Sequence, residues 1–382
     1  NGLTHGLDGW VYAANGGNDG RPYWWGDTTT AVDLRGHDFR FNLKTRTLER
    51  LGESSGGFEL AADEYGRIFE THNLTHVSHL VFPERYKRGK TLLQEHALEN
   101  ISDHEENGLA RIYPIGEQES RVNHPEQSGY FSGSCGITYY GGGALGDSYQ
   151  HTVWVADVVL NLIHIDKISP HGASFSASRI HEKRDFLASG DRSFRPVNMS
   201  VGPDGAMYVV DMYRKVIEHP EWIPDDIEKT LDLEAGKDKG RIYRIMKTGD
   251  HAAFDVKQFD TNEGLVQSLS HPNQWVRNTA HRLLMEQPLE AATVELLHAA
   301  LDDTDPLVNI HALHILSAQK ALKPNSLISL LESPSPEVTE VALQLAESMI
   351  HEYPDLVKLC IDQLGHKDQR VRMQAALSLS TI

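Results

Sequence analysis

One hairpin pattern, repeated three times, constrains the first two thirds of this chain more than any other feature. Its clearest copy lies in FRPVNMSVGPDGAMYVVDMYR, residues 194–214. Apolar residues alternate with polar ones or glycine over 197–202, which is the period of a strand with one buried face. The Pro-Asp-Gly sequence at 203–205 favours a tight turn, because proline presets φ and glycine accepts a positive φ. The apolar run Met207–Val210 then predicts the returning strand.

Two earlier segments repeat this pattern, LTHGLDGWVYAAN at 3–15 and FELAADEYGRIFETHN at 58–73. Their turns are predicted at Leu7-Asp8-Gly9 and around Gly66. Three such hairpins among other strand-like segments favour a radial all-β array, a β-propeller. Three unrelated hairpins in a β-sandwich are the alternative. The propeller is favoured because the match extends beyond the turns.

The pattern becomes helical after Lys247. Valine recurs about every 30 residues, and each valine is followed by alanine after four residues and by leucine after seven or eight. This spacing places the three side chains on one helical face, where alanine lets neighbouring helices approach closely. Four copies in phase predict an α-solenoid that resembles HEAT-like repeats. The copies are Val276-Ala280-Leu284, Val308-Ala312-Leu316, Val338-Ala342-Leu345 and Val371-Ala375-Leu379.

These two patterns predict the domain organisation. We expect a propeller over residues 1–247, a linker over 248–262 and a HEAT-like solenoid over 263–382. The chain begins one strand into a hairpin and ends inside a predicted helix. We therefore expect a fragment of a longer protein, with the propeller truncated at its N-terminus and the solenoid at its C-terminus.

The charge of the chain bears on its partners. It has 36 Lys and Arg against 54 Asp and Glu, a formal net charge of −18. Because nucleic-acid surfaces need clustered positive charge, we expect no nucleic-acid partner. The acidic balance is compatible with solubility outside the cytoplasm and with divalent cations. No apolar run reaches the ~18 residues that a membrane helix needs, so no membrane span is expected.

The two cysteines, Cys135 and Cys360, fall in different predicted domains. We therefore expect no disulfide framework, and the sequence holds no Cys-x-x-Cys motif for a metal or a haem. It also lacks a Gly-x-Ser-x-Gly elbow, a phosphate-cradling glycine loop and a dinucleotide fingerprint. A nucleotide cofactor is accordingly not expected.

The densest histidine cluster contains His72, Asn73, His76 and His79. On a helix these spacings would bring the imidazoles to one face, where they can bind a transition metal. In an extended segment, His72 and His76 would share one face and His79 would lie on the other. We predict His72, His76 and His79 as metal ligands, and His76 and His79 as catalytic residues. The alternative is a set of interior histidines that bond to backbone carbonyls.

A second polar group surrounds the hairpin at residues 194–214 and consists of Arg195, Asp211, Tyr213 and Arg214. Asp211 ends an apolar strand, where a carboxylate needs a partner or a solvated rim. Arg195 and Arg214 are its candidate partners, and arginine suits a planar acidic cofactor or a sugar carboxylate. We predict these four as cofactor-binding residues. A structural ion-pair network that locks the sheet is the alternative.

The loop over 15–26 is rich in glycine and aromatic residues. Its Tyr23, Trp24 and Trp25 predict either an aromatic platform for sugars or a loop that packs its own rings on the propeller wall. Acidic side chains in this region offer calcium an oxygen-rich site, although their spacing does not match the EF-hand loop. They are Asp8, Asp19, Asp27, Asp33 and Asp38.

Several motifs together resemble one family. They include THNLTHVSHLVFPERY, SGSCGITYYGG, DFLASGDRSFRPVNMSVGPDGAMYVVDMYRKVIEHPEWIP and AGKDKGRIYRI. The chain resembles the membrane-bound-dehydrogenase proteins of planctomycetes and their relatives, closely over residues 1–247. These are large secreted proteins with a propeller similar to quinoprotein sugar dehydrogenases, a HEAT-like segment and often a C-terminal c-type cytochrome domain.

This resemblance implies a fold and an activity. The fold would be part of a six-bladed, sugar-dehydrogenase-like propeller followed by the solenoid. The activity would be dehydrogenation of a sugar or related alcohol at the propeller mouth, with pyrroloquinoline quinone and calcium as cofactors. A histidine would take the hydroxyl proton while hydride passes to the quinone, and a c-type haem outside this chain would accept the electrons. The implied location is periplasmic or secreted.

Two other function classes remain open. A non-catalytic scaffold that binds carbohydrate or protein is the first, because propellers and solenoids are both common interaction platforms, and a protein partner would then dock on the solenoid. A hydrolase with metal-bound water is the second, and it would need His72, His76 or His79 to hold the metal.

Overall fold

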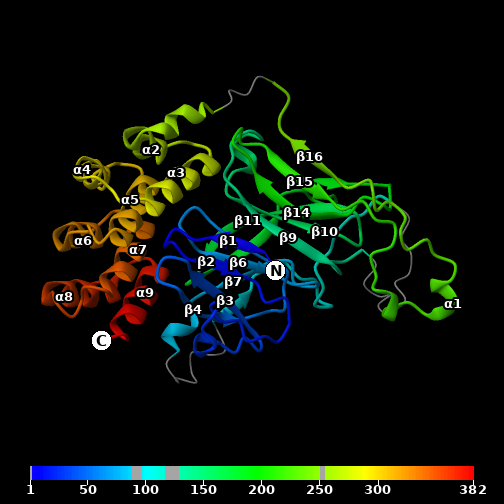
Figure 1. The fold of residues 1–382 in the computed structure, drawn as a ribbon, viewed down its shortest axis with the longest axis horizontal. Helices are drawn as coiled ribbons and strands as arrows, with labels where there is room; N and C mark the ends of the chain where they lie inside the picture. The colour runs from blue at the N-terminus through cyan, green and yellow to red at the C-terminus, as the bar shows by residue number, and fades with distance from the viewer. Residues whose placement is uncertain (1, 88–96, 117–128, 250–253) are drawn as a thin grey trace.

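Four antiparallel sheets follow one another along the first two thirds of the chain, and paired helices make up the rest (Figure 1). This is a computed structural model of residues 1–382. It describes all of them except 1, 88–96, 117–128 and 250–253. Residues 250–253 belong to the predicted linker, so that part of the domain prediction lies outside the described residues. The predicted domain boundaries themselves stay a prediction.

Each sheet is a meander in which consecutive strands pair side by side. The first sheet holds β1 (Leu3–His5), β2 (Val11–Ala13), β3 (His37–Asn42) and β4 (Thr47–Glu53). The second holds β5 (Glu59–Ala62), β6 (Ile68–Thr71), β7 (Ser78–Leu80) and β8 (Leu98–Asn100). The third holds β9 (Ser134–Tyr140), β10 (Thr152–Asp157), β11 (Leu162–His171) and β12 (Ser174–Arg179), and β13 (Leu187–Ala188) also pairs with β11. The fourth holds β14 (Pro196–Val201), β15 (Met207–Asp211) and β16 (Arg241–Ile245).

The sheets are arranged as propeller blades. The first strand of each sheet contacts the first strand of the next, so that β1 meets β5, β5 meets β9 and β9 meets β14. Apolar side chains fill the spaces between neighbouring sheets: Phe69 and Val155 belong to the core between the second and third, and Trp154 and Met199 to the core between the third and fourth. First strands that meet around a common axis, with sheets packed face to face, are the architecture of a propeller. The predicted fold class, blade-like β-sheets followed by an all-α region, is confirmed.

The turn of the repeated hairpin is held by its aspartate. In the first sheet, Asp8 accepts hydrogen bonds from the backbone N of Trp10 at 3.1 Å and from the hydroxyl of Tyr12 at 2.7 Å. Asp204 in the fourth sheet makes the same two bonds at the same spacing of two and four residues. Gly205 has a φ of 74°, which a residue with a side chain rarely adopts. The shared pattern in the sequence is therefore a shared turn in the structure.

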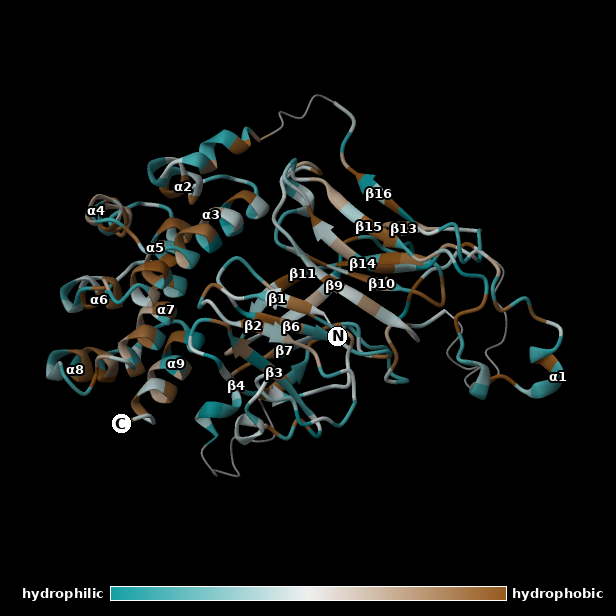
Figure 2. Cartoon of the chain, in the orientation of Figure 1, coloured by the Kyte–Doolittle hydropathy of each residue, from teal (hydrophilic) through white to brown (hydrophobic). Residues whose placement is uncertain are grey.

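The helical part forms two layers. One layer holds α3 (Gln274–Glu286), α5 (Pro306–Ala318), α7 (Pro336–Ala346) and α9 (Gln369–Leu379), each in contact with the next. The other holds α2 (Asn262–Ser268), α4 (Ala291–Ala300), α6 (Pro324–Leu331) and α8 (Pro354–Asp362), while α1 (Asp225–Glu228) lies in the segment between β15 and β16. The α3–α9 layer faces the sheets (Figure 1), and Figure 2 shows hydrophobic residues along α5 and α7. Within the described part of the chain, every helix is too short or too polar to span a bilayer.

The thirty-residue repeat is the inner layer of these helices. Its valines, Val276, Val308, Val338 and Val371, are all buried there. A polar residue caps the start of each inner helix, as Asp368 does by accepting a hydrogen bond from the backbone N of Arg370 at 2.8 Å. The corresponding caps of α3, α5 and α7 are Asn273, Asp305 and Ser335.

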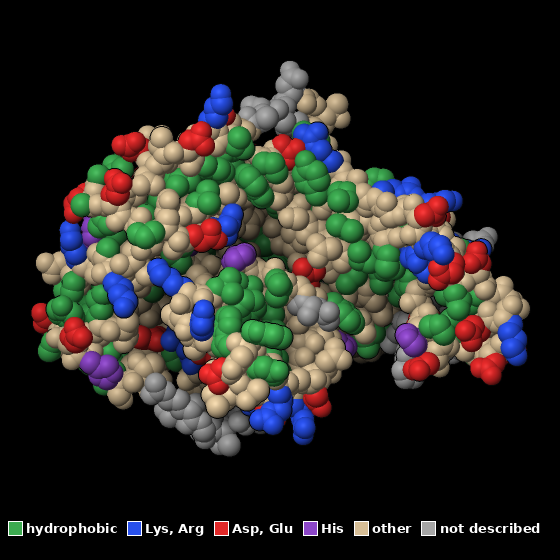
Figure 3. All heavy atoms as spheres, in the orientation of Figure 1, with side chains coloured by type: hydrophobic (Ala, Val, Ile, Leu, Met, Phe, Trp, Pro, Cys, Tyr) green, Lys and Arg blue, Asp and Glu red, His purple; other side chains and the backbone are tan. Residues whose placement is uncertain are grey.

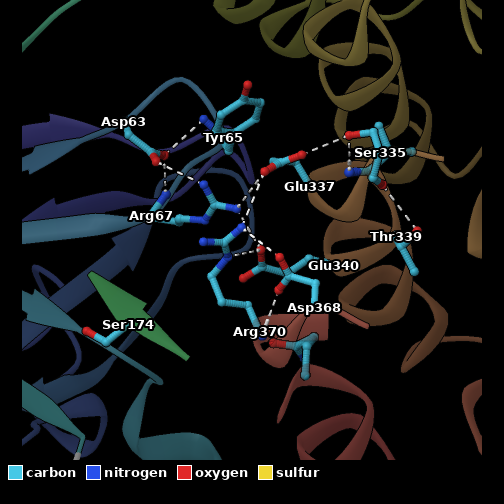
Figure 4. A network of polar contacts seen from close by, with 12 residues as sticks. Asp63, Tyr65, Arg67, Ser174, Ser335, Glu337, Thr339, Glu340, Asp368 and Arg370 are labelled. Carbon is cyan, nitrogen blue, oxygen red and sulfur yellow. Dashed lines mark hydrogen bonds and ion pairs between the residues drawn. The ribbon is translucent and has the colours of Figure 1, made fainter. Parts of the chain in front are cut away.

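The helices dock on the sheets through a network of buried charges (Figure 4). Arg67, in the second sheet, donates to Glu340 of α7 at 2.8 Å and to Asp63 at 3.3 Å. Arg370 of α9 joins the same network through Glu337 at 3.4 Å. The side chains of Arg67 and Arg370 are 11% and 4% exposed, so these charges lie inside the junction. The two parts of the chain are therefore packed together as one unit.

Candidate functional site

A cavity of about 840 Å³ lies where the first strands of the four sheets meet the helical layer. Its wall is built from β1, β5, β9 and β14, and α3 closes one side. Figure 3 shows the molecule hollowed between the helices and the sheets. We call this space the axial cavity. Its polar and aromatic lining includes Thr4, Glu59, Thr138, Asn198, Ser200 and Trp275.

Two side chains from separate sheets pair on the wall of the axial cavity. Asn198 Nδ2 of β14 donates to Glu59 Oε2 of β5 at 2.6 Å. The strand register shifts between Pro196 and Asn198, an irregularity that re-aims side chains where it occurs. Burial raises the pKa of Glu59, and the hydrogen bond from Asn198 opposes this only in part. The cavity thus presents a carboxyl group that keeps its proton to a higher pH than an exposed glutamate does.

The remaining charges of the axial cavity lie at its edge. Lys44 is exposed. Arg282 is exposed as well and pairs with Glu286 at 2.7 Å. Burial, and then the charge of Arg282, lower the pKa of His5, which favours its neutral form. The described lining of the cavity therefore mixes polar and apolar side chains and holds no buried lysine or arginine.

The predicted histidine cluster is divided by the structure. The segment from His72 to β7 is irregular or extended rather than helical. His79 lies on β7, where its Nδ1 is 2.9 Å from the Ser174 hydroxyl and burial lowers its pKa to about 3. His76 is buried between the second and third sheets and stacks on Phe131, with ring centroids 4.4 Å apart. The catalytic and metal roles predicted for these three histidines stay predictions.

His76 meets two residues that sequence reasoning did not select. Its Nε2 lies 2.6 Å from Asp166 Oδ2, and His164 Nε2 lies 2.8 Å from the other oxygen of Asp166. Burial opposes the charged form of His164, but the charges and hydrogen bonds of Asp166 and Asp185 together outweigh burial and raise the pKa of His164 to about 9. Among the described residues, this trio is the group whose ligand atoms gather closely enough for a metal ion, and His72 and His79 are outside it.

A sequence signal for this trio existed. Leu162, His164 and Asp166 alternate along β11 with Ile163 and Ile165, so the polar pair shares one face of an otherwise apolar strand. Leu162 belongs to the core against the second sheet, whereas Ile163 and Ile165 belong to the core against the fourth. The polar face therefore points to the sheet that carries His76.

The four predicted cofactor-binding residues do lie together, but they contact one another and the backbone. Arg195 N donates to Asp211 Oδ1 at 2.8 Å, and Tyr213 N donates to the same oxygen at 2.8 Å. The Arg195 guanidinium bonds to carbonyl oxygens, which belong to Val158, Val159, Arg214 and Lys215. Arg214 likewise donates to a carbonyl, that of Leu233. The ion pair of Asp211 is with Arg241, at 3.7 Å, and not with Arg195 or Arg214. The contacts among the four predicted residues are hydrogen bonds to backbone groups rather than the ion-pair network of the alternative, and a cofactor role stays a prediction.

The aromatic loop and the aspartates of the first sheet show no common site. Trp24 packs edge-on against Phe41, with centroids 6.5 Å apart, while the side chain of Trp25 is 98% exposed. Trp24 thus packs as the structural alternative predicts, and an aromatic platform for sugars stays a prediction. In the part of the chain that the structure describes, the five aspartates predicted as calcium ligands do not gather into one group.

Comparison with known proteins gives one family match. Residues 1–249 match the family described as "Domain of unknown function (DUF7133)". No curated protein matches the chain. The chain also resembles several solved structures at TM-scores of 0.31 or less, and it spans about three fifths of the length of the first of them.

Three solved structures illustrate this distance. A glucose dehydrogenase-type oxidoreductase from Thermus thermophilus is 15% identical, with a TM-score of 0.31, over 56% of this chain and 58% of its own. A second glucose dehydrogenase is 17% identical, with a TM-score of 0.31, over 55% of this chain and 60% of its own. An engineered protein is 22% identical, with a TM-score of 0.23, over 31% of this chain and 61% of its own.

Proposed function

The chain belongs to the DUF7133 family, and from its axial cavity we propose that it binds a neutral sugar or a related polyol. The observation that carries this proposal is the Glu59–Asn198 pair. A carboxylate accepts hydrogen bonds from hydroxyl groups, and an amide can both donate to them and accept from them. The volume of about 840 Å³ lies within the range of small-molecule sites. Thr138 and Ser200 add hydroxyls, and Trp275 adds an aromatic face against which a sugar ring can pack.

The described residues do not fit the quinone that the family resemblance implies. Pyrroloquinoline quinone carries three carboxylates, which need cations beside them. The cavity holds its two cations at the edge, and one of them, Arg282, is paired with Glu286. Arg195 has its guanidinium engaged by carbonyl oxygens. We therefore derive no step through the quinone, and the implied calcium, the c-type haem acceptor and the periplasmic or secreted location stay predictions of the resemblance.

Dehydrogenation of the bound alcohol is a second candidate function, and the raised pKa of Glu59 favours it. Oxidation of an alcohol to a carbonyl removes a proton from oxygen and a hydride from carbon. The Glu59 carboxylate is placed to accept the proton, and a separate two-electron acceptor would take the hydride. A binding protein without chemistry would need Glu59 only as a hydrogen-bond acceptor.

Calorimetric titration with neutral sugars, polyols and sugar acids tests the binding proposal. We expect saturable binding of a neutral member and a loss of at least about tenfold in affinity, or about 1.4 kcal/mol, in Glu59→Gln, which keeps the shape but loses the charge. Glu332→Gln, an exposed residue of the solenoid, is the matched control and should bind as the unchanged chain does.

Two results would contradict the proposal. The first is that an anion, such as the quinone itself, binds tightly while neutral sugars do not bind. The second is sugar binding that Glu59→Gln leaves untouched, because the ligand would then lie outside the axial cavity.

A further inference from the structure

Three buried side chains from two neighbouring sheets converge on one point. His76 precedes β7 in the second sheet, and His164 and Asp166 lie on β11 in the third. Their ligand atoms all lie within 4.8 Å of one another. Two imidazoles and a carboxylate are the protein ligands of many divalent transition-metal sites, and the spacing is close to that of atoms that share one ion.

A second carboxylate, that of Asp185, orients the His164 ring in the way that metal-binding histidines are oriented. Its Nε2 faces Asp166, and its Nδ1 lies 2.7 Å from Asp185 Oδ1. Asp185 is itself held by the backbone N of Tyr113, which donates to its second oxygen at 2.6 Å. A carboxylate behind a histidine fixes the tautomer that points the other ring nitrogen at a metal and raises its basicity.

A partly exposed carboxylate, that of Asp103, lies beside the buried trio. Asp103 Oδ1 is 3.9 Å from His76 Nε2. The Asp103 side chain is 38% exposed, whereas those of His76, His164 and Asp166 are at most 2% exposed. Asp103 therefore connects the buried trio to solvent and supplies the carboxylate that would complete a four-coordinate set.

We propose that His76, His164, Asp166 and Asp103 form a binding site for a divalent transition metal of the zinc class, which ties the second sheet to the third. The ion would neutralise the two ligand carboxylates and replace the direct His–Asp hydrogen bonds seen here. This site is separate from the axial cavity, so it stands or falls independently of sugar binding. Its ligand set also differs from the trio predicted from sequence spacing, because it keeps His76 and replaces His72 and His79.

Cobalt(II) titration of the full chain, after dialysis against a chelator, tests the site. We expect one equivalent of Co²⁺ to produce the visible absorption of a four-coordinate ion and one equivalent of Zn²⁺ to displace it. Zinc should also raise the Tm of the chain, because a ligand that binds the folded state stabilises it.

Variants assign the site to its residues. His164→Gln should abolish the cobalt spectrum. In case that variant does not fold, Asp185→Asn leaves every ligand in place and should weaken zinc binding about 10- to 100-fold. His79→Gln, a buried histidine of the same segment, should bind cobalt unchanged.

Each opposite result overturns the proposal. If stoichiometric cobalt produces no four-coordinate spectrum, the cluster binds no metal and is held together by its hydrogen bonds alone. Binding that survives His164→Gln with full affinity, or that is lost in His79→Gln, would place the metal elsewhere.

Discussion

At the scale of single residues, Glu59 and Arg195 show why a charge alone does not identify a site. The sequence predicts Arg195 as a ligand-binding charge beside Asp211, yet its guanidinium bonds to four carbonyl oxygens of the protein. Glu59 has one side-chain partner, Asn198, and lines a cavity. The same rule separates the two residues: a polar atom engaged by the protein braces the fold, and one that faces open space can bind.

The second candidate function makes a prediction for Glu59. If the propeller oxidises its sugar, Glu59→Gln should lower kcat about 10²- to 10⁴-fold, in addition to its effect on affinity, because the proton acceptor is lost. The rate of the unchanged chain should fall as the pH drops through the raised pKa of Glu59, since only the carboxylate accepts a proton. Reduction of a soluble two-electron dye measures both effects, with Glu332→Gln as the control. If Glu59→Gln leaves the rate unchanged, Glu59 is not the proton acceptor, and the binding proposal stands without the dehydrogenation step.

At the scale of elements, the axial cavity depends on how closely β9 and β14 approach. Gly136 of β9 has a φ of 63°, and a Cβ there would lie 3.0 Å from both Asn198 Cα and the Val197 carbonyl oxygen. A side chain at this position would push β14 outward together with Asn198. The strand contact and the binding pair are therefore set by the same glycine.

Gly136→Ala should accordingly affect stability and binding together. We expect about 1–3 kcal/mol less stability from the left-handed backbone, and a weaker affinity for the sugar because Asn198 moves relative to Glu59. Urea denaturation and calorimetry give the two numbers. Gly190→Ala is the matched control, since that glycine has no positive φ and nothing lies within 4 Å of the added carbon. Equal behaviour of the two variants would show that β9 and β14 tolerate separation.

At the scale of the whole molecule, sheets and helices meet through buried polar groups. His281 of α3 bonds to the Leu7 carbonyl at 2.8 Å and lies 2.9 Å from His311 of α5 between the two Nδ1 atoms. Burial, and then the nearby His314, lower the pKa of His281 to about 3, and burial lowers that of His314 to about 4 although the charge of Asp8 opposes it. These histidines are neutral in the folded chain, and an acid pH must protonate them inside the junction.

This junction predicts acid lability of the folded chain. A histidine whose pKa is lowered by folding contributes its full stabilisation of the folded chain at a pH above its unfolded pKa of about 6.5. That contribution is lost as the pH falls toward its folded pKa. Each such histidine should remove about 1.4 kcal/mol per pH unit below pH 6.5. Urea unfolding midpoints measured from pH 7.5 to 5 give the slope of stability against pH. His314→Gln should make this slope shallower, whereas His351→Gln, at an exposed position, should leave it unchanged. A slope that His314→Gln leaves unchanged would assign the acid lability to other groups.

The features of this protein that could be predicted from its sequence are local ones. The Asp-Gly turns, the strand alternation and the valine-alanine-leucine register depend on neighbours within a few residues, and the structure repeats them at Asp8, Asp204 and the four inner helices. Their physics is turn chemistry and periodicity, which a single sequence carries. The all-β propeller and the all-α solenoid could therefore be predicted without coordinates.

Which polar residues meet depends on contacts between segments that lie far apart in the sequence. His76 contacts Asp166, 90 residues away, and Glu59 contacts Asn198, 139 residues away. Spacings of three and four residues predict that these histidines act together, but His76 and His79 bond to different residues of the third sheet, Asp166 and Ser174. Such pairs depend on how blades pack around an axis, and local spacing carries no record of that packing.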